Sequence, residues 1–519
     1  MKIAKVETLH CDGGWRPWTF VRVETDEGLV GWGECSDNRS PYGIAGAVRD
    51  MEDLLLGQDP RPVERLYWDM LRRTRQNLGG VTHKAIAGVE LALWDIKAKA
   101  LGVPVYELFG GPLRDRMRLY WSHCGTTRAR LGDVLGTPPL RSYADITALG
   151  KEVVARGFTA LKTNIVIPGE PATVYFPGFA SGINTTDGAP TAEVLGAVER
   201  LIGTFRDAVG PSVGLCLDLN YNFRTEGVLR IAKLLEPFDM QWVEYDNWDP
   251  QALLQIKQST STRLASCESL VTTRQYRPFL ELHAMDVCII DVPWNGFSQA
   301  VQIGRMAEVY EINIAPHNYY SHLADLHSIH LCAVLPNVRI MEIDIDDVPW
   351  KAELVTRPPV IKDGHIHLPT GPGWGADIDE KVLRAHPWPG PAAGSARRST
   401  GCHPSRWPRG RSPSRMLKKA HLLRWRPRPP CHVTRETIGP TNFRLQGPDM
   451  APHSPTRVRL ACGRRAPPCI WTFLSILRVF PHPARLQPGE DAVGEVLDNP
   501  VLAVQGRVQH DLAQALALE

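Results

Sequence analysis

The chain has 519 residues, of which 43% are hydrophobic and 22% are charged, and its formal net charge is +3. These proportions are those of a globular protein and exclude a fibrous or wholly disordered chain. The first residues, MKIAKVETLH, are too polar for a secretion signal, and no apolar run reaches the length of a membrane span. The eleven cysteines form no CxxC pair. We therefore expect reduced thiols, a cytoplasmic location and no membrane partner.

Residues 1–115 predict a small α+β domain. Two strand-like stretches, KIAKVETLHC and TFVRVETDEGLVGWGE, flank the loop DGGWRPW, which contains Trp15 and Trp18. This loop is either an ordinary surface loop with half-buried aromatics or a flap whose tryptophans reach a substrate. Helices are expected around 43–57 and 62–76. A stronger helical pattern follows in THKAIAGVELALWDIKAKALG, whose Gly102 stands where a C-cap would.

Residues 116–350 predict a barrel of alternating strands and helices. It begins with RLYWSHCG (118–125), and its second strand, FTALKTNIVI, places Lys162 and Asn164 on the same face. Lys162 is either a solvated charge or, at a strand end beside a metal, a base or an anion-steering charge. The Gly/Pro-rich stretch 167–190 is either a lid or a disordered insert.

Six short apolar runs follow, and each leads to an ionisable residue. Successive end residues lie 26, 24, 23, 26 and 25 positions apart, which is the length of one strand, one return helix and two loops. Continuous apolar runs at this repeat are typical of buried parallel strands, and they predict a β/α barrel. The end residues are Asp218, Glu244, Glu268, Asp291, His317 and Glu342.

The C-terminal strand ends of such a barrel meet at one mouth, so these six side chains should face one pocket. Three consecutive carboxylates offer hard oxygen ligands, which suit Mg²⁺. Asp291 followed by His317 gives an orienting carboxylate and an imidazole base. Glu342, across the mouth, could donate a proton or a hydrogen bond.

The last part of the chain changes character near Trp388. A Gly/Pro-rich segment and a short helix at 351–387 are expected to complete the first domain. Residues 391–480 then hold 18 Lys and Arg but only two Asp and Glu, whereas the rest of the chain has a net charge of −13. We expect 388–489 to be a disordered basic tail, similar in composition to an out-of-frame translation, and 490–519 to hold a short helix. A nucleic-acid-binding arm is the less favoured alternative.

The chain from residue 1 to about 387 resembles the enolase superfamily, in its mandelate racemase and muconate lactonizing enzyme branch. The resemblance rests on AIAGVELALWDIKAKALGVPVYELFGG, the strand-end acids, APHN and GPGWGADIDE. It implies an α/β fold, a (β/α)7β modified TIM barrel with an N-terminal α+β capping domain. It also implies the roles of the strand-end residues: Mg²⁺ bound by Asp218, Glu244 and Glu268, His317 paired with Asp291 as general base or acid, and Glu342 at an enediolate oxygen.

Two departures from the family pattern bear on the reaction. Racemases of this family commonly carry Lys-x-Lys on the second strand, whereas here Asn164 takes the second place, as in galactonate dehydratases. Those enzymes have a His two residues after the first metal ligand, where this chain has Asn220. The resemblance therefore implies a Mg²⁺-dependent dehydratase of a sugar acid other than galactonate, or of a related 2-hydroxy acid.

The resemblance further implies a homo-oligomer and a small-molecule carboxylate substrate that contacts Asn164, Asn220, Trp15 and Trp18. One alternative is a racemase or epimerase that uses Lys162 and His317 on opposite faces of the substrate. Another is an inactive scaffold whose basic tail binds nucleic acid.

Overall fold

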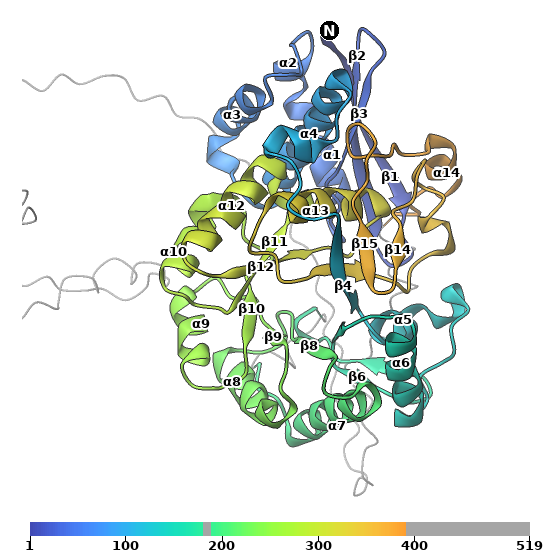
Figure 1. Cartoon of the computed structure of the whole chain (residues 1–519), viewed down its shortest axis with the longest axis vertical. Helices are drawn as coiled ribbons and strands as arrows, with labels where there is room; N and C mark the ends of the chain where they lie inside the picture. Colours follow the sequence, from blue (N-terminus) through green and yellow to red (C-terminus); the bar gives the residue numbers. More distant parts are fainter. Residues whose placement is uncertain (180–187, 391–519) are drawn as a thin grey trace, which may run out of the picture. The chain divides into compact units, whose positions relative to one another are not determined.

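A computed structural model of the chain describes residues 1–179 and 188–390 (Figure 1). The predictions for the basic tail and for the helix at 490–519 fall on residues outside this range, apart from 388–390. Part of the stretch 167–190 is described: β6 (Val166–Ile167) pairs antiparallel with β7 (Thr173–Val174). Within the described residues, no helix is long and apolar enough to span a membrane.

The N-terminal part is an antiparallel three-stranded sheet covered by helices. The strands are β1 (Ile3–Asp12), β2 (Pro17–Thr25) and β3 (Val30–Glu34). The helices are α1 (Pro41–Asp50), α2 (Glu52–Leu55), α3 (Val63–Arg73) and α4 (Gly80–Leu101). Helix α4 approaches β3 so closely that a Cβ on Gly31 would lie 2.1 Å from the Ala92 carbonyl oxygen. As predicted, α4 ends at Gly102, which adopts a left-handed conformation with φ +71°.

Eight parallel strands form the barrel. Its strands are β4 (Arg116–Ser122), β5 (Ala160–Thr163), β8 (Gly214–Asp218), β9 (Trp242–Glu244), β10 (Leu264–Ser266), β11 (Val287–Asp291), β12 (Asn313–His317) and β13 (Met341–Asp344). Neighbouring strands pair in this order from β4 to β12, and β13 pairs with β4. A bridge between Ile314 of β12 and Val338, three residues before β13, connects the last two strand segments. The predicted TIM barrel with a capping domain is confirmed.

Helices surround the barrel (Figure 1). They are α5 (Thr126–Leu135), α6 (Tyr143–Ala155), α7 (Ala192–Val209), α8 (Thr225–Leu234), α9 (Pro250–Lys257), α10 (Thr272–Glu281), α11 (Val292–Asn295), α12 (Phe297–Val309) and α13 (His322–Val334). Inside the barrel, one separate cluster of fully buried side chains fills the space between the strands. It consists of Tyr120, Ala160, Cys216, Trp242, Ala265, Val287, Ile289, Ala315 and Ile340. The interior is therefore a packed core, and chemistry is confined to its rim.

The capping domain is attached to the rim where β11 and β12 end. Glu34 accepts hydrogen bonds from the backbone N–H groups of Ser321 (3.3 Å) and Ala324 (3.1 Å), at the start of α13. Glu90 likewise accepts from the N–H groups of Phe297 (2.8 Å) and Ser298 (2.9 Å), at the start of α12. Carboxylates at helix N-termini are favourable partners, so these contacts hold the cap over the strand ends.

The C-terminal segment returns to both domains. Strand β15 (His365–His367) pairs antiparallel with β14 (Ile361–Lys362) and with β4 of the barrel. Helix α14 (Glu380–Ala385) follows. Between them, the buried Trp374 donates its indole N–H to the carbonyl of Trp32 (3.0 Å) in the cap sheet. This segment therefore ties the cap to the barrel.

Candidate active site

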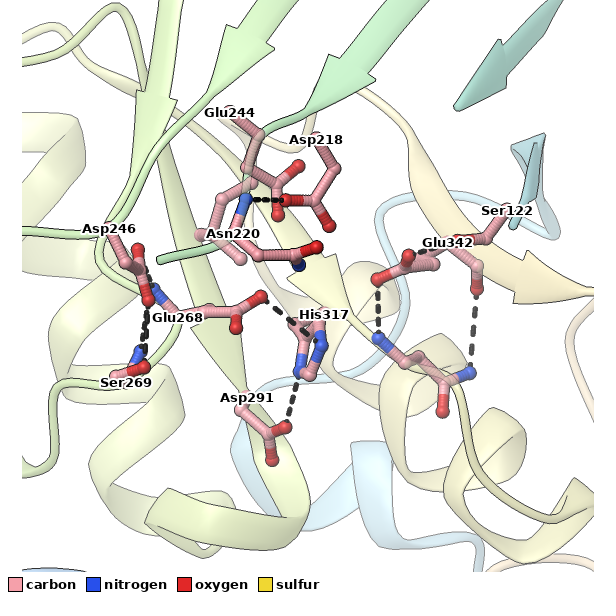
Figure 2. A network of polar contacts seen from close by, with 12 residues as sticks. Ser122, Asp218, Asn220, Glu244, Asp246, Glu268, Ser269, Asp291, His317 and Glu342 are labelled. Carbon is pink, nitrogen blue, oxygen red and sulfur yellow. Dashed lines mark hydrogen bonds and ion pairs between the residues drawn. The ribbon is translucent and has the colours of Figure 1, made fainter. Parts of the chain in front are cut away.

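The strand register brings the predicted residues to one rim. Asp218 ends β8 directly opposite Glu244 at the end of β9, and Asp291 ends β11 opposite His317 at the end of β12. Glu268 follows β10 by two residues, and Glu342 lies in β13. Figure 2 shows Asp218 beside Glu244, with Glu268 extending toward His317. Six residues spread over 125 positions of sequence thus face one space.

His317 is clamped between two carboxylates. Its Nδ1 lies 2.6 Å from Oδ2 of Asp291, which also accepts the hydroxyl of Tyr320 at 2.6 Å. Its Nε2 lies 3.3 Å from Oε2 of Glu268. Burial opposes a charged ring, but the charges of Glu268 and Asp291 outweigh it and raise the pKa of His317 to about 10. Asp291 therefore fixes the tautomer and orientation of the ring, and Nε2 faces the mouth.

Lys162, on β5, lies among the acids of the opposite side. Its Nζ is 2.8 Å from Oε1 of Glu342, 3.1 Å from Oε1 of Glu244 and 3.8 Å from Oδ2 of Asp218. Burial lowers the pKa of Lys162, but Glu244 and Glu342 outweigh burial and raise it well above its ordinary value. Lys162 is therefore a buried ammonium ion that balances carboxylates, and its amine is not free to act as a base in this arrangement.

The three acids predicted as metal ligands repel one another in a buried site. Burial raises the pKa of Glu244 to about 7; Lys162 opposes this rise, and the charges of Asp218 and Glu342 add to it. Burial and neighbouring carboxylates also raise the pKa of Glu268 well above its usual range. Among the described residues no three His, Cys, Asp or Glu side chains are gathered as a ready-made coordination sphere; Lys162 contacts Glu244 and Asp218, and His317 contacts Glu268. The donor set still fits a hard divalent cation, because it consists of carboxylates that repel one another.

Glu342, for which a proton or a hydrogen bond to the substrate was predicted, lies against a lysine and accepts hydrogen bonds from the protein. Its Oε2 accepts the backbone N–H of Asn318 at 2.8 Å, and its Oε1 contacts Lys162 and the hydroxyl of Ser122. Burial would raise the pKa of Glu342, but Lys162 and then His317 outweigh it and lower it to about 2. An ion pair that sequence spacing does not reveal thus makes Glu342 an acceptor.

Asn164 and Asn220, predicted to bind substrate, bind each other. The Asn164 amide donates to Oδ1 of Asn220 (3.0 Å) and to the carbonyl of Asp218 (3.2 Å), and its Oδ1 accepts the Thr126 hydroxyl at 3.0 Å. Asn164 is therefore fully engaged with protein and supports the end of β8. The backbone N–H of Asn220 donates to Asp218 at 2.8 Å, which orients that carboxylate.

The two predicted tryptophans have different positions. Trp15 lies in the short loop between β1 and β2, is half-buried, and stacks on Tyr319 with ring centroids 5.6 Å apart. Tyr319 in turn contacts the ring of His317 at 5.0 Å. Trp18 belongs to strand β2 and is completely buried in the core. A contact of Trp18 with a substrate stays a prediction; of the two tryptophans, the half-buried Trp15 is the more accessible.

Two groups near the mouth were not singled out from sequence. Asp246 accepts the backbone N–H groups of Cys267 (2.9 Å), Glu268 (3.3 Å) and Ser269 (3.1 Å). It holds a turn in which Cys267 has a φ of +92°, a strained value for a residue other than glycine. The sequence offered one sign of Asp246: it lies in the motif VEYDN, at a place where the family usually has Glu-Glu-Pro.

The second group is an additional imidazole–carboxylate pair. Nδ1 of His123, the residue after β4, lies 2.8 Å from Oδ1 of Asp344 in β13. The two residues are 221 positions apart in the chain, so their pairing could not be read from spacing.

Comparisons with known proteins agree with this geometry. Residues 13–110 match the family described as "Mandelate racemase / muconate lactonizing enzyme, N-terminal domain", and residues 145–382 match the "Enolase C-terminal domain-like" family. The D-xylonate dehydratase of Haloferax volcanii is 30% identical over 74% of this chain and 89% of its own length. The D-galactonate dehydratase of Ralstonia pickettii is also 30% identical, over 74% of this chain and 94% of its own.

A solved structure is similar as well. A candidate L-alanine-DL-glutamate epimerase from Burkholderia xenovorans, bound to magnesium and fumarate, has a TM-score of 0.72 and 39% sequence identity. The match covers 74% of this chain and 96% of that one. The family matches cover both domains, and they agree with the barrel topology and with the residues at the strand ends. The chain belongs to the mandelate racemase/muconate lactonizing enzyme branch of the enolase superfamily.

Proposed function

We propose that the protein is a lyase, a Mg²⁺-dependent dehydratase of a sugar acid or a related 2-hydroxy acid. The observation that carries this proposal is the His317–Asp291 pair, which faces the carboxylate group Asp218, Glu244 and Glu268 across one mouth. The dehydratase names of the 30%-identical relatives support the same reaction class.

The chemistry explains why these residues are needed together. A proton next to a carboxylate is very weakly acidic, because its removal leaves two negative charges on the carboxylate oxygens. Mg²⁺ held by Asp218, Glu244 and Glu268 would bind the substrate carboxylate and offset that charge. The Lys162 ammonium, buried beside the same acids, contributes further positive charge in a water-poor site.

His317 would remove the α-proton through Nε2. Its ring is held by Asp291, and Nε2 is directed into the mouth toward Glu268. A base must be neutral, and in the free protein the charge of Glu268 favours the protonated ring. Glu268 would be one of the residues that hold the cation, and engaged in this way it would attract the proton of His317 less strongly.

The decisive experiment is a screen of a sugar-acid library with Mg²⁺, followed by NMR of the reaction in D₂O. Formation of a 2-keto acid supports the dehydratase. Recovery of substrate with inverted configuration and deuterium at the α-carbon would show an epimerase instead of a dehydratase. An epimerase is the second candidate because the Burkholderia xenovorans protein is 39% identical. The close ion pairs of Lys162 count against its service as the second base.

A variant defines the role of His317. His317→Asn should abolish both keto-acid formation and α-proton exchange, while Mg²⁺ affinity measured by calorimetry remains near that of the wild type. Loss of Mg²⁺ binding in this variant would contradict the role as a base.

A further inference from the structure

A second imidazole–carboxylate pair lies on the rim, formed by His123 and Asp344. Asp344 is buried in β13, and its Oδ1 lies 2.8 Å from Nδ1 of His123. The pair resembles His317–Asp291 in arrangement: a histidine at a strand end is held through Nδ1 by the buried acid of the neighbouring strand. The register differs by one residue: Ser122 stands opposite Asp344 and His123 follows it, whereas His317 itself stands opposite Asp291.

Several contacts hold His123 and Asp344 in place. His123 has a φ of +46°, a left-handed conformation that costs a non-glycine residue free energy. Asp344 is held in turn by Arg16 of the cap loop, whose Nη2 lies 3.4 Å from Oδ2, and its carbonyl accepts Nζ of Lys351 at 3.2 Å. The acid is therefore fixed, and the ring of His123, whose side chain is 14% exposed, keeps Nε2 for another partner.

His123 and His317 contact the same aromatic side chain, Tyr319. The ring of Tyr319 contacts both imidazoles, with centroids 5.0 Å from His317 and 6.0 Å from His123. Trp15 of the cap also contacts both Tyr319 and His123, at 5.6 and 6.1 Å. The residue before His123, Ser122, contacts Glu342 through its hydroxyl. The two histidines thus have Tyr319 as a common neighbour, beside the cap loop that carries Trp15.

We propose that His123, oriented by Asp344, is the general acid that protonates the departing β-hydroxyl group. This assignment rests on the proposed dehydratase function and completes it. A hydroxide ion is a poor leaving group, so elimination needs a proton donor near the β-carbon. In the protonated ring, Nδ1–H is held by Asp344 and Nε2–H is the proton that would be donated.

Other nearby groups are poor donors. Lys162 is bound by Glu244 and Glu342, and Asn220 has only an amide to offer. In the step, His317 takes the α-proton and its C–H electron pair forms the Cα–Cβ double bond. The β-carbon–oxygen bond breaks, and the oxygen receives the Nε2 proton of His123 and leaves as water. The resulting enol becomes the 2-keto-3-deoxy acid, and the two rings return to their starting states by exchange with solvent.

The test separates proton abstraction from departure of the hydroxyl. In His123→Asn the side-chain amide can still donate to Asp344, but the acidic proton is lost. With an acid that the wild type dehydrates, keto-acid formation should fall by about 10²-fold or more, the usual contribution of general acid catalysis. Exchange of the α-proton in D₂O should continue, and Mg²⁺ affinity should not change. His317→Asn, as the matched variant, should lose both.

A substrate analogue with a better leaving group provides a second test of the same assignment. Fluoride leaves without needing a full proton transfer, so a 3-deoxy-3-fluoro analogue of the same acid should restore elimination in His123→Asn, measured as fluoride release. Keto-acid formation at the wild-type rate in this variant would overturn the assignment, as would equal loss of exchange and elimination. If the wild type exchanges the α-proton without forming any keto acid, the dehydratase itself is wrong, and the assignment falls with it.

Discussion

Replacing Lys162 with methionine should strongly destabilise the protein. The ammonium is 97% buried and lies within 3.1 Å of Glu244 and 2.8 Å of Glu342, so methionine preserves the length of the side chain but leaves two buried carboxylates without a counter-charge. Removing one partner of a buried ion pair typically costs about 3–5 kcal/mol. We expect a loss of this size in the free energy of unfolding when EDTA is present.

The assay is urea denaturation followed by tryptophan fluorescence. Lys151→Met, a change of the same kind at an exposed position of α6, serves as the control and should shift the free energy by no more than about 0.5 kcal/mol. Added Mg²⁺ should recover part of the loss in Lys162→Met, since a divalent cation among the same carboxylates replaces the missing charge. A loss below about 1 kcal/mol in EDTA would refute the view that this ammonium balances the acids.

Two further variants test structural assignments. Asp246→Asn removes a charged acceptor from the turn that carries Glu268. It should weaken Mg²⁺ binding, measured by calorimetry, by about 10- to 100-fold, the usual effect of losing a group that orients a metal ligand. Unchanged affinity would show that the turn keeps its conformation without the Asp246 carboxylate. His330 accepts the Tyr106 N–H through Nδ1 (3.2 Å), and burial lowers the pKa of His330 to about 3. The neutral ring therefore stabilises the folded protein near neutral pH. This stabilisation is lost as the pH falls from about 6.5 toward 3, because the unfolded chain takes up the proton first. His330→Asn should therefore be less stable than wild type at pH 7, with the difference narrowing in urea titrations toward pH 4. A stability difference that stays constant between pH 7 and pH 4 would contradict this reading.

Local patterns in the chain were enough to predict the barrel and most of its rim. The apolar runs between Val213 and Asp346 are continuous because their strands are buried on both faces, and their regular repeat reflects one strand and one helix per unit. Once the strands are parallel, their C-terminal residues must meet at one end. Asp218, Glu244, Asp291 and His317 stand there for that reason alone.

Contacts between residues of distant strands could not be predicted from local sequence patterns. Trp18 lies in a sequence motif rich in Gly and Pro, yet β2 begins at Pro17, so Trp18 belongs to a strand and is fully buried. The charge of Glu342 depends on an ammonium that reaches it from β5, and sequence spacing carries no information on that distance.

The sequence by itself determined which side chains end the strands, because strand length and helix length are local properties. The pairing of β13 with β4, which closes the barrel, decided that His123 meets Asp344 and that Ser122 meets Glu342. Closure joins the first and last strands of the cylinder, residues more than two hundred positions apart. Only the tertiary structure can decide such partners, because their proximity comes from the register of the whole sheet.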